Sequence, residues 1–257
     1  MLTAHAEAVW SAVAPLLPGF TVEVLPAVDS TNSELMRRAR AGLMEPVLLA
    51  AEEQTAGRGR LGKGWHSRPG QSLTFSLALP LAPADWSGLS LAVGVSLADS
   101  LDPAIRLKWP NDLWWDDRKL GGILVETASP LDAPSGARRL VVVGVGLNIA
   151  RPADAAIAPG GVAPAGLAER LVGLTAGEAL ARVVPPLVQD LLLFEREGFA
   201  AFASRFAARD ALRDRAVRLS DGTDGTALGV DEDGALRVHT AGGLRRVTSA
   251  DVSVRPC

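Results

Sequence analysis

The chain has 257 residues, of which 48% are hydrophobic and 21% are charged, so it can bury a substantial core in one large domain and leave room for a small second one. Its net charge of -3 gives no general attraction to nucleic acid or to an anionic membrane. The only cysteine is Cys257, which excludes a disulfide framework and a thiolate metal site within the chain. Residues 1–10 lack the basic segment of a signal peptide, and the longest apolar run, residues 140–147, is too short to span a bilayer, so we expect a cytoplasmic protein.

Hydrophobic spacing divides the first part of the chain into helices and strands. An apolar repeat of about 3.6 residues indicates a helix, whereas strict alternation indicates a strand. Thr31 and Glu34 have the spacing of a capping box, so a helix is expected to begin there and to be closed by Gly42. The other predicted helices are residues 4–17 and 87–101, and the predicted strands are residues 20–25, 47–51, 72–79, 105–109, 120–127 and 140–149.

The second part of the chain changes character near residue 213. Residues 150–166 are rich in Pro, Ala and Gly and are typical of an irregular connection. Helices are predicted at residues 175–197, where Pro185 and Pro186 should interrupt the helix, and at residues 199–212. Short strands and turns then predict a small β-barrel, with strands at residues 216–220, 226–230, 236–240 and 245–248. We therefore expect an α+β domain of residues 1–212 followed by a small β domain of residues 213–257.

Residues 57–71 form a basic, glycine-rich loop with five glycines and four arginines or lysines. Glycine allows close approach of the backbone to a ligand, and arginine offers a fork for phosphate or carboxylate, so the loop points to an anionic ligand. Gly57, Gly62 and Lys63 fit the spacing of a Walker A loop, and the glycines also fit G-x-G-x-x-G. Both motifs require a helix directly afterwards, but a strand is expected here, so both are rejected. A solvated surface loop is the alternative.

Two further segments carry candidate chemistry. K-W-P-N-D-L, residues 108–113, ends a predicted strand in a turn, for which an ordinary hairpin is the alternative explanation. Lys119 enters an apolar strand, where a partly desolvated lysine is a strong point charge for phosphate or carboxylate. A lysine at a sheet edge that extends its amine into solvent is the alternative.

Polar residues also lie at the ends of several predicted strands. D-S-T-N, residues 29–32, joins a strand to a helix, and its hydroxyls can cap the helix, bind a polar ligand, or do both. Gln54 precedes the glycine-rich loop and can present an amide to a ligand. G-V-G-L-N, residues 144–148, has glycines that allow close approach of a flat ring and ends in Asn148, which could read that ring or sit near a metal.

Together and in this order the motifs resemble those of bacterial biotin–protein ligases. They are D-S-T-N, E-x-Q-T-A-G-R-G-R-x-G-x-x-W, K-W-P-N-D-L, R-K-L-x-G-I-L-V-E and G-x-G-x-N, over residues 28–148. The tail G-T-A-L-G-V-D-E-D-G-A-L-R-V resembles the family's SH3-like C-terminal domain. Some members carry an N-terminal winged helix-turn-helix that represses their own operon. Only 28 residues precede Asp29, so we expect the short form, without this DNA-binding domain.

The resemblance implies a fold, a reaction and partners. The fold is a mixed sheet with helices on one side, like class II synthetases and biotin–lipoate ligases, followed by an SH3-like β-barrel. The biotin carboxylate attacks the α-phosphate of ATP to give biotinyl-5′-AMP, and a lysine of a biotin carboxyl carrier domain of a carboxylase then takes the biotin. ATP, Mg²⁺ and biotin are implied, no DNA or membrane partner is expected, and an exposed sheet edge would allow a homodimer.

The resemblance also assigns roles to residues. Lys119 is expected to contact both anionic groups as the catalytic residue, with Arg58 closing over the adenylate and Asp112 helping the incoming amine or orienting the lysine. Trp65 is expected to cover the biotin tail. The biotin-binding set is Ser30, Thr31, Asn32, Gln54, Gly57, Arg58, Arg60, Trp65, Lys119 and Gly122. The nucleotide-binding set is Arg58, Arg60, Lys119, Asn111 and Asn148, and no metal ligand is assigned.

Three other functions compete with this one. A lipoate–protein ligase shares the fold and the adenylate chemistry, but K-W-P-N-D and G-R-G-R-x-G favour biotin. A non-catalytic biotin or nucleotide sensor would be favoured by loss of Lys119 or of the loop arginines, and all of these are present. A DNA-binding repressor is disfavoured by the missing N-terminal domain and by the net negative charge.

Overall fold

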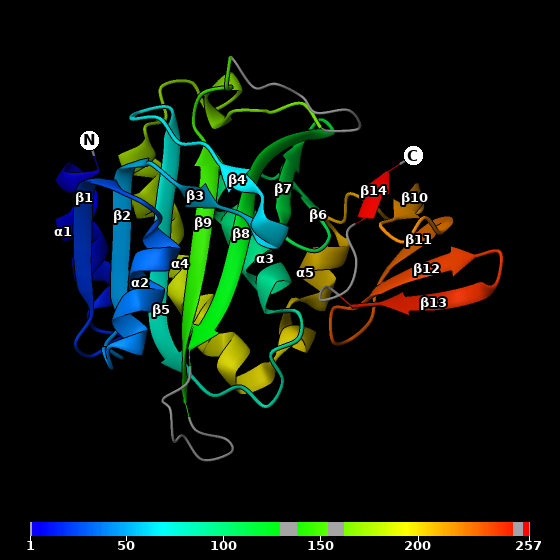
Figure 1. The fold of residues 1–257 in the computed structure, drawn as a ribbon, viewed down its shortest axis with the longest axis horizontal. Coiled ribbons are helices and arrows are strands. Elements are labelled where there is room, and N and C mark those ends of the chain that lie inside the picture. The colour runs from blue at the N-terminus through cyan, green and yellow to red at the C-terminus, as the bar shows by residue number, and fades with distance from the viewer. Residues whose placement is uncertain (1, 129–137, 154–161, 249–253, 257) are drawn as a thin grey trace.

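A seven-stranded mixed sheet forms the centre of the larger part of the molecule (Figure 1). The computed structural model describes residues 2–128, 138–153, 162–248 and 254–256. The strand order is β1-β2-β5-β9-β8-β7-β6, with β1 and β2 parallel and the other neighbours antiparallel, so the predicted mixed sheet is confirmed. The strands are β1 (Thr21–Val28), β2 (Val47–Gln54), β5 (Ser72–Leu81), β6 (Arg106–Lys108), β7 (Asp112–Trp115), β8 (Arg118–Ala128) and β9 (Arg139–Asn148).

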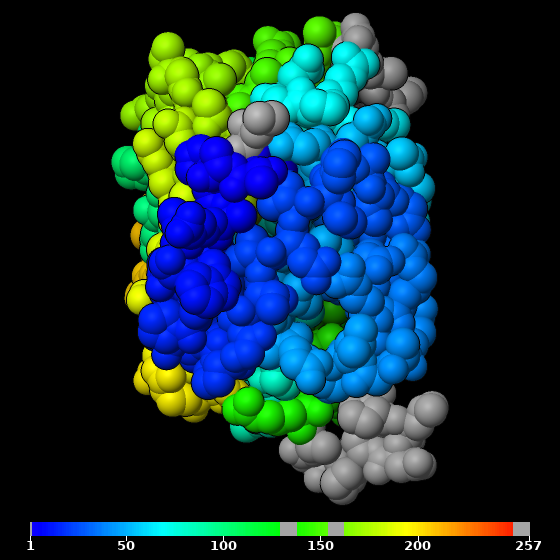
Figure 2. All heavy atoms as spheres, turned by 90° about the vertical axis from the view of Figure 1, so that its left-hand side faces the viewer, coloured from blue at the N-terminus to red at the C-terminus, as the bar shows by residue number. Residues whose placement is uncertain are grey.

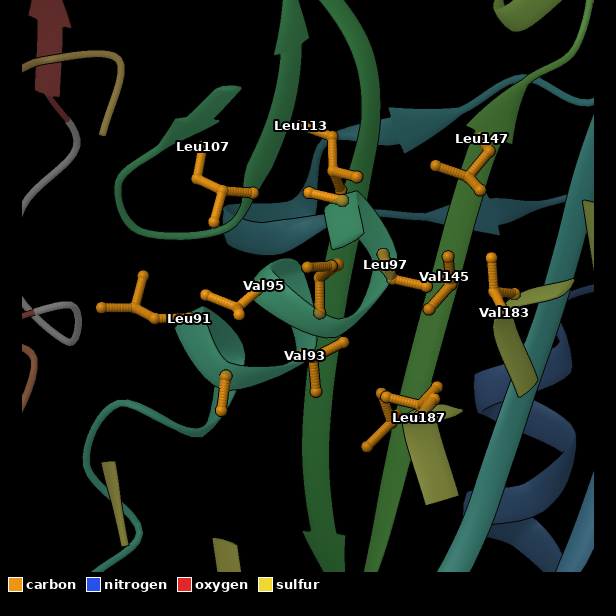
Figure 3. Close-up of a cluster of buried hydrophobic side chains, with 14 of the residues drawn as sticks. Leu91, Val93, Val95, Leu97, Leu107, Leu113, Val145, Leu147, Val183 and Leu187 are labelled. Atoms are coloured by element: carbon orange, nitrogen blue, oxygen red, sulfur yellow. The ribbon is translucent and has the colours of Figure 1, made fainter. Parts of the chain in front are cut away.

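Three helices cover one face of this sheet, in line with the predicted mixed sheet with helices on one side. They are α1 (Thr3–Val13), α3 (Leu89–Leu101) and α4 (Ala176–Glu197). Figure 3 shows the core between α3, α4 and the sheet, with Val93, Val95 and Leu97 of α3, Val145 and Leu147 of β9, and Val183 and Leu187 of α4. Burial of this apolar surface is the main source of stability in the larger domain.

A fourth helix, α2 (Thr31–Arg40), lies on the opposite face over β2, β5, β8 and β9. Leu35 and Met36 pack there on a second, smaller cluster with Leu49, Ala78 and Val142. Figure 2, seen from the β1 side, shows the N-terminal segments in blue making up most of this side of the molecule. Because α2 covers only part of its face, the rest of that face is left for a cavity.

The alternation of β9 sets the two faces apart. Val143 and Val145 belong to the large core, whereas Val142 belongs to the small cluster on the α2 face. Gly144 and Gly146 therefore also lie on the α2 face, because side chains alternate along a strand.

Three predicted helices differ in the structure. Pro185 and Pro186 do not interrupt α4, because buried residues before and after them pack on the core and outweigh the roughly 3 kcal/mol that proline costs inside a helix. The helix predicted at residues 199–212 is wrong beyond a 3₁₀ turn (Phe199–Phe202) and the short α5 (Ala203–Ala207). The following chain instead bonds to the free edge of β6, where unpaired backbone groups offer partners. Helix α1 ends earlier than predicted, at Val13.

The glycine-rich loop and the K-W-P-N-D-L turn contain strands that the sequence pattern did not predict. A two-stranded ribbon of β3 (Gly57–Arg58) and β4 (Gly64–Trp65) encloses a 3₁₀ turn (Arg60–Gly62). Strand β7 completes a hairpin with β6, so the ordinary-hairpin alternative describes the backbone correctly. Another 3₁₀ turn (Leu167–Glu169) follows the connection predicted at residues 150–166, of which residues 154–161 lie outside the described part.

A second, five-stranded antiparallel sheet forms the C-terminal part, as predicted for the small SH3-like unit. Its order is β13-β12-β11-β10-β14, with β10 (Ala216–Leu219), β11 (Asp224–Val230), β12 (Leu236–Thr240), β13 (Gly243–Val247) and β14 (Val254–Pro256). Strand β14 was not predicted, and the proposed domain boundary at residues 212–213 stays a prediction. Within the described ranges, no helix is both long enough and apolar enough to cross a membrane.

Candidate functional site

A cavity of about 180 Å³ opens on the α2 face of the large sheet, beneath the glycine-rich loop. Segments far apart in sequence supply its walls: the start of α2, the loop, the β6–β7 turn, and strands β8 and β9. Ten of its lining residues are Ser30, Thr31, Asn32, Gln54, Arg58, Arg60, Trp65, Asn111, Asp112 and Lys119. Gly122 also lines it, so the cavity brings together all the predicted site residues except Gly57 and Asn148.

Two glycines of β9 form the floor of the cavity. A Cβ at Gly146 would lie 2.5 Å from the Trp65 ring, and one at Gly144 would lie 2.1 Å from the Asn32 amide oxygen. Any side chain here would displace one of these groups, so the flat indole can approach the strand only because glycine is present. The indole of Trp65 thereby forms an apolar surface beside the cavity.

A network of neutral polar groups forms one wall. The backbone N–H and the hydroxyl of Thr31 both donate to Gln54 Oε1, at 2.7 and 3.0 Å. The buried Ser76 hydroxyl lies within hydrogen-bond distance of both Thr31 Oγ1 and Asn32 Oδ1. These groups have fixed orientations, and none of them is charged, so the wall suits a neutral ligand group with both donors and acceptors.

The start of α2 is fixed by a cap and an ion pair. Ser30, rather than the predicted Thr31, is the N-cap and accepts from Ser33 N. Thr31 is therefore free to bond Gln54. Arg37 donates to both carboxylate oxygens of Asp29, and these bonds hold the pKa of Asp29 at about 2.

Positive charge enters the cavity from two strands. Lys119 Nζ donates to Asp112 Oδ1 at 2.7 Å, and Lys108 Nζ lies 4.0 Å from Asp112 Oδ2. The side chain of Lys119 is 38% exposed and that of Asp112 is 17% exposed, so the amine reaches the cavity while the carboxylate is held behind it. The pair can present a cation whose position is fixed by its own counter-ion.

The loop arginines are engaged with groups of the sheet. Arg58 Nη2 donates to Glu126 Oε1 at 2.6 Å, while the other oxygen of Glu126 accepts from Asn32 Nδ2 at 3.0 Å. Arg60 Nη1 lies 3.5 Å from Asn111 Oδ1. Burial lowers the pKa of the Arg60 guanidinium from its usual value, and Asp112 counteracts this.

Gly57 and Asn148 lie outside the cavity lining. Asn148 Nδ2 donates to the backbone oxygens of Ala165, at 2.9 Å, and Lys119, at 3.4 Å. A side chain on Gly57 would lie 2.4 Å from the Trp65 backbone oxygen and 2.9 Å from Gln54 Nε2. In this structure the two residues therefore shape the backbone near the site; their predicted ligand contacts stay predictions.

The sequence analysis missed several cavity residues. Lys63 and Lys108 line the cavity, and Glu126 binds Arg58. Lys108 and Glu126 stand inside motifs already quoted. A stronger signal was available: Lys63, Lys108 and Lys119 are the chain's only three lysines among 26 basic residues, and all three line this cavity. Ser76 had no such signal, because only the fold places it against α2.

Among the described residues there is no group of three or more His, Cys, Asp or Glu side chains arranged to hold a metal ion. The chemical resources of the cavity are cations from the loop, from β6 and from β8, a neutral polar wall and an apolar indole. Such a site can hold two anionic groups side by side and bind an uncharged polar ring next to them.

Comparison with known proteins identifies a family for this chain. Residues 24–148 match the model of the biotin/lipoate A/B protein ligase family, and residues 215–255 match the biotin protein ligase C-terminal domain. The bifunctional ligase/repressor BirA of Escherichia coli is 36% identical over 93% of this chain and 75% of its own length. The biotin–[acetyl-CoA-carboxylase] ligase of Mycobacterium tuberculosis is 32% identical over 90% of this chain and 88% of its own.

Solved structures of biotin protein ligases have a similar fold. The biotin protein ligase of Aquifex aeolicus in complex with biotin and ATP superposes with a TM-score of 0.72 at 26% identity, covering 92% of this chain and 99% of that one. Both matched regions, the similarity along the chain and the fold thus coincide with one group of enzymes. The chain belongs to the biotin/lipoate A/B protein ligase family, among its biotin protein ligases.

Proposed function

We propose that this protein is an ATP-dependent ligase that activates biotin as biotinyl-5′-AMP and transfers it to a lysine of a biotin carboxyl carrier domain. One observation carries the proposal: Arg58, Arg60 and Lys119 line the same cavity as an uncharged polar wall. Its relatives are named biotin–[acetyl-CoA-carboxylase] ligases, and one solved neighbour holds biotin and ATP, which supports both substrates and a carboxylase as partner.

In the first step the carboxylate of biotin must approach the α-phosphate of ATP. Two anions repel each other, and most strongly where water is excluded, so fixed cations between them lower the barrier. Lys119 is held by Asp112 at 2.7 Å, so its amine needs little reorganisation to serve both groups. Attack of a carboxylate oxygen on the α-phosphorus forms the mixed anhydride and releases pyrophosphate.

Arg58 has to change partner during this step. It is paired with Glu126 at 2.6 Å, and the arginine side chain is 47% exposed, so the exchange of a carboxylate for a phosphate or a ligand carboxylate costs little desolvation. The ribbon of the glycine-rich loop would move with Arg58 and close over the adenylate. Closing excludes water, which would otherwise hydrolyse the anhydride.

The polar wall accounts for recognition of the biotin ring. A ureido group is neutral and has both donors and acceptors, which match the amide of Gln54 and the hydroxyl of Thr31. The indole of Trp65 would cover the apolar tail, since its ring already lies against Gly146. In this proposal Ser30 and Asn32 hold the polar wall in place through their own hydrogen bonds, and Gly122 leaves room beside Lys119.

The second step joins the acyl group to a lysine amine of the carrier, and AMP leaves. The amine must lose a proton as its nitrogen attacks the acyl carbon. Asp112 is the carboxylate nearest to Lys119 in the cavity, and we assign it the orientation of that lysine or of the incoming amine. Asn111 and Asn148 are proposed on the nucleotide side.

Magnesium is proposed as the counter-ion of ATP, because Mg²⁺ in such sites is bound largely through substrate phosphates and water. Since ATP is supplied in the cytoplasm, we place the reaction there. A homodimer through an exposed sheet edge stays a prediction, to be checked by the mass of the particle in solution.

The test is direct. The purified protein is mixed with biotin, MgATP and a carrier domain, and the intact mass of the carrier is measured; one biotin per carrier is expected. A parallel reaction with lipoate tests the lipoate-ligase alternative, and tight biotin binding without transfer would favour a sensor. Lys119→Ala should abolish transfer. Arg182→Ala, an exposed change on α4 behind the sheet, serves as the matched control.

A further inference from the structure

The β6–β7 hairpin carries Asn111 and Asp112 to the cavity. Residues outside the large sheet hold this hairpin by hydrogen bonds. The segment that leads to the C-terminal part runs along the free edge of β6. Leu107 N donates to Arg209 O at 2.8 Å, and Ala211 N donates to Leu107 O at 2.9 Å. The Arg209 guanidinium also donates to the backbone oxygens of Asp102, Pro103 and Ile105.

The C-terminal sheet itself makes a second contact with this hairpin. The turn between β11 and β12 ends at Gly234, whose backbone oxygen accepts from Trp109 Nε1 at 3.0 Å. Trp109 is 1% exposed, so this bond is shielded from water. Gly234 has a φ of +81°, and a Cβ on it would lie 2.9 Å from Gly88 Cα at the start of α3. The turn is thus wedged between an indole and a helix.

Packing leaves space on one side of the Trp109 indole. A second hollow, of about 300 Å³, borders Trp109 and Gly234 and extends toward Trp86 and Leu91. Where neighbours leave such space, a buried hydrogen bond defines the position of a ring more than contact does. The position of the β11–β12 turn therefore contributes, through this bond, to where the Trp109 indole lies.

Trp109 is directly followed by Pro110, Asn111 and Asp112, all of which line the cavity, and Asp112 holds Lys119. We infer that the C-terminal domain acts on catalysis by seating Trp109, which is a positioning residue for the Asp112–Lys119 pair. This rests on the proposed function. It gives the C-terminal sheet a role in the chemistry, although none of its residues that the structure describes lines the cavity.

The contact can be tested from both of its sides. Gly234→Ala introduces the clash with Gly88 and pushes the turn from its seat, whereas Trp109→Phe keeps a ring but removes the donor. Gly222→Ala is the matched control, because Gly222 also lies in a turn of the C-terminal sheet, has a φ of +87° and has nothing within 4 Å of an added Cβ. All variants are assayed as full-length protein below their unfolding temperatures.

We expect Gly234→Ala to lower kcat for adenylate formation by about 10-fold to 100-fold, while the Kd for biotin changes by less than about twofold. Trp109→Phe should lower kcat by about fivefold, which is the effect of one hydrogen bond. Gly222→Ala should lose stability with unchanged kcat. The double variant of Trp109→Phe and Gly234→Ala should be no slower than Gly234→Ala, because both changes break one contact.

Equal kcat values for Gly234→Ala and Gly222→Ala would overturn the inference, as would effects that multiply in the double variant. The proposed function fails in a different way, since the wild-type protein would then transfer no biotin. A loss of biotin affinity in step with kcat would also count against positioning, because it would indicate general damage to the cavity.

Discussion

The two faces of the large sheet are built from the same strands but from different residues. On β5, Leu77 is fully buried under the helices, while its neighbour Ser76 turns to the other face and meets Thr31 and Asn32. On β9, Val143 and Val145 enter the core, while Gly144 and Gly146 leave space for the cavity. The face under α1, α3 and α4 is filled with apolar side chains, whereas part of the α2 face is left open as the cavity.

This fold assigns stability and function to opposite faces of one sheet. Glycine within a strand costs stability, because it offers no side chain to pack. The core on the other face offsets that cost, since β5 packs against α4 and both β5 and β9 contribute buried side chains to the large core. Changes on the cavity face should therefore damage the chemistry with little loss of stability, and changes on the core face should do the reverse.

The largest effect is expected at Lys119. Lys119→Ala removes the cation held between Asp112 and the cavity, and should lower the rate of adenylate formation on the order of 10²-fold to 10³-fold. The thermal unfolding temperature should stay close to that of the wild type, because the side chain is 38% exposed. Pyrophosphate release measures the rate, and scanning calorimetry measures the unfolding temperature. Near-wild-type activity would show that the cavity face does not carry the chemistry.

The converse change is Leu77→Ala on the core face. It removes a fully buried side chain and should lower the free energy of unfolding by about 2–5 kcal/mol. The KM for biotin should be unchanged at temperatures where the variant is folded. Urea unfolding and steady-state kinetics provide the measurements, and a KM that rises together with the instability would show that the two faces are coupled.

A single methyl group added to the floor of the cavity should affect ligand binding alone. Gly146→Ala places a Cβ 2.5 Å from the Trp65 ring, so the indole must move and the cover over biotin is lost. The Kd for biotin, measured by calorimetric titration, should rise about tenfold, equivalent to about 1.4 kcal/mol. The unfolding temperature should hardly change. Unaltered affinity would mean that Trp65 has no contact with biotin.

The smallest effect is expected outside both faces, at Asp210 beside β6. Burial raises the pKa of this carboxyl above its usual value, and its Oδ2 has no hydrogen-bond partner among the described residues. Because the folded protein holds the proton more tightly than the unfolded chain, stability falls as the pH rises from the ordinary carboxyl pKa through the raised one.

Asp210→Asn should therefore stabilise the protein at neutral pH by about 1 kcal/mol, since Oδ1 can still accept from Leu212 N. The gain should vanish at a pH below the ordinary carboxyl pKa. Unfolding free energies at two pH values give the answer; a gain independent of pH would mean that the charge is not the cause.

The sequence was a good guide wherever local chemistry decides. Turn residues and alternation located most strands of both sheets, although not β7 or β14, and the motifs identified the cavity segments before the fold joined them. It failed where tertiary contacts decide. Packing on both sides carries α4 through Pro185 and Pro186, and the free edge of β6 draws residues after α5 out of their predicted helix.

The site shows the same division. Lys119, Asp112 and the loop arginines followed from residue type and motif order. Ser76 and Glu126 did not, because their roles depend on register: pairing across β5, β9 and β8 places them opposite Asn32. Lys63 and Lys108 could have been found from the scarcity of lysine alone.

The most direct test is a crystal structure of the protein with biotin and a non-hydrolysable ATP analogue. We predict the biotin ring beside Thr31 and Gln54 above Gly146, with its carboxylate and the α-phosphate both within hydrogen-bond distance of Lys119. Ligands bound elsewhere, or an amine of Lys119 that remains on Asp112 and touches neither group, would contradict the account.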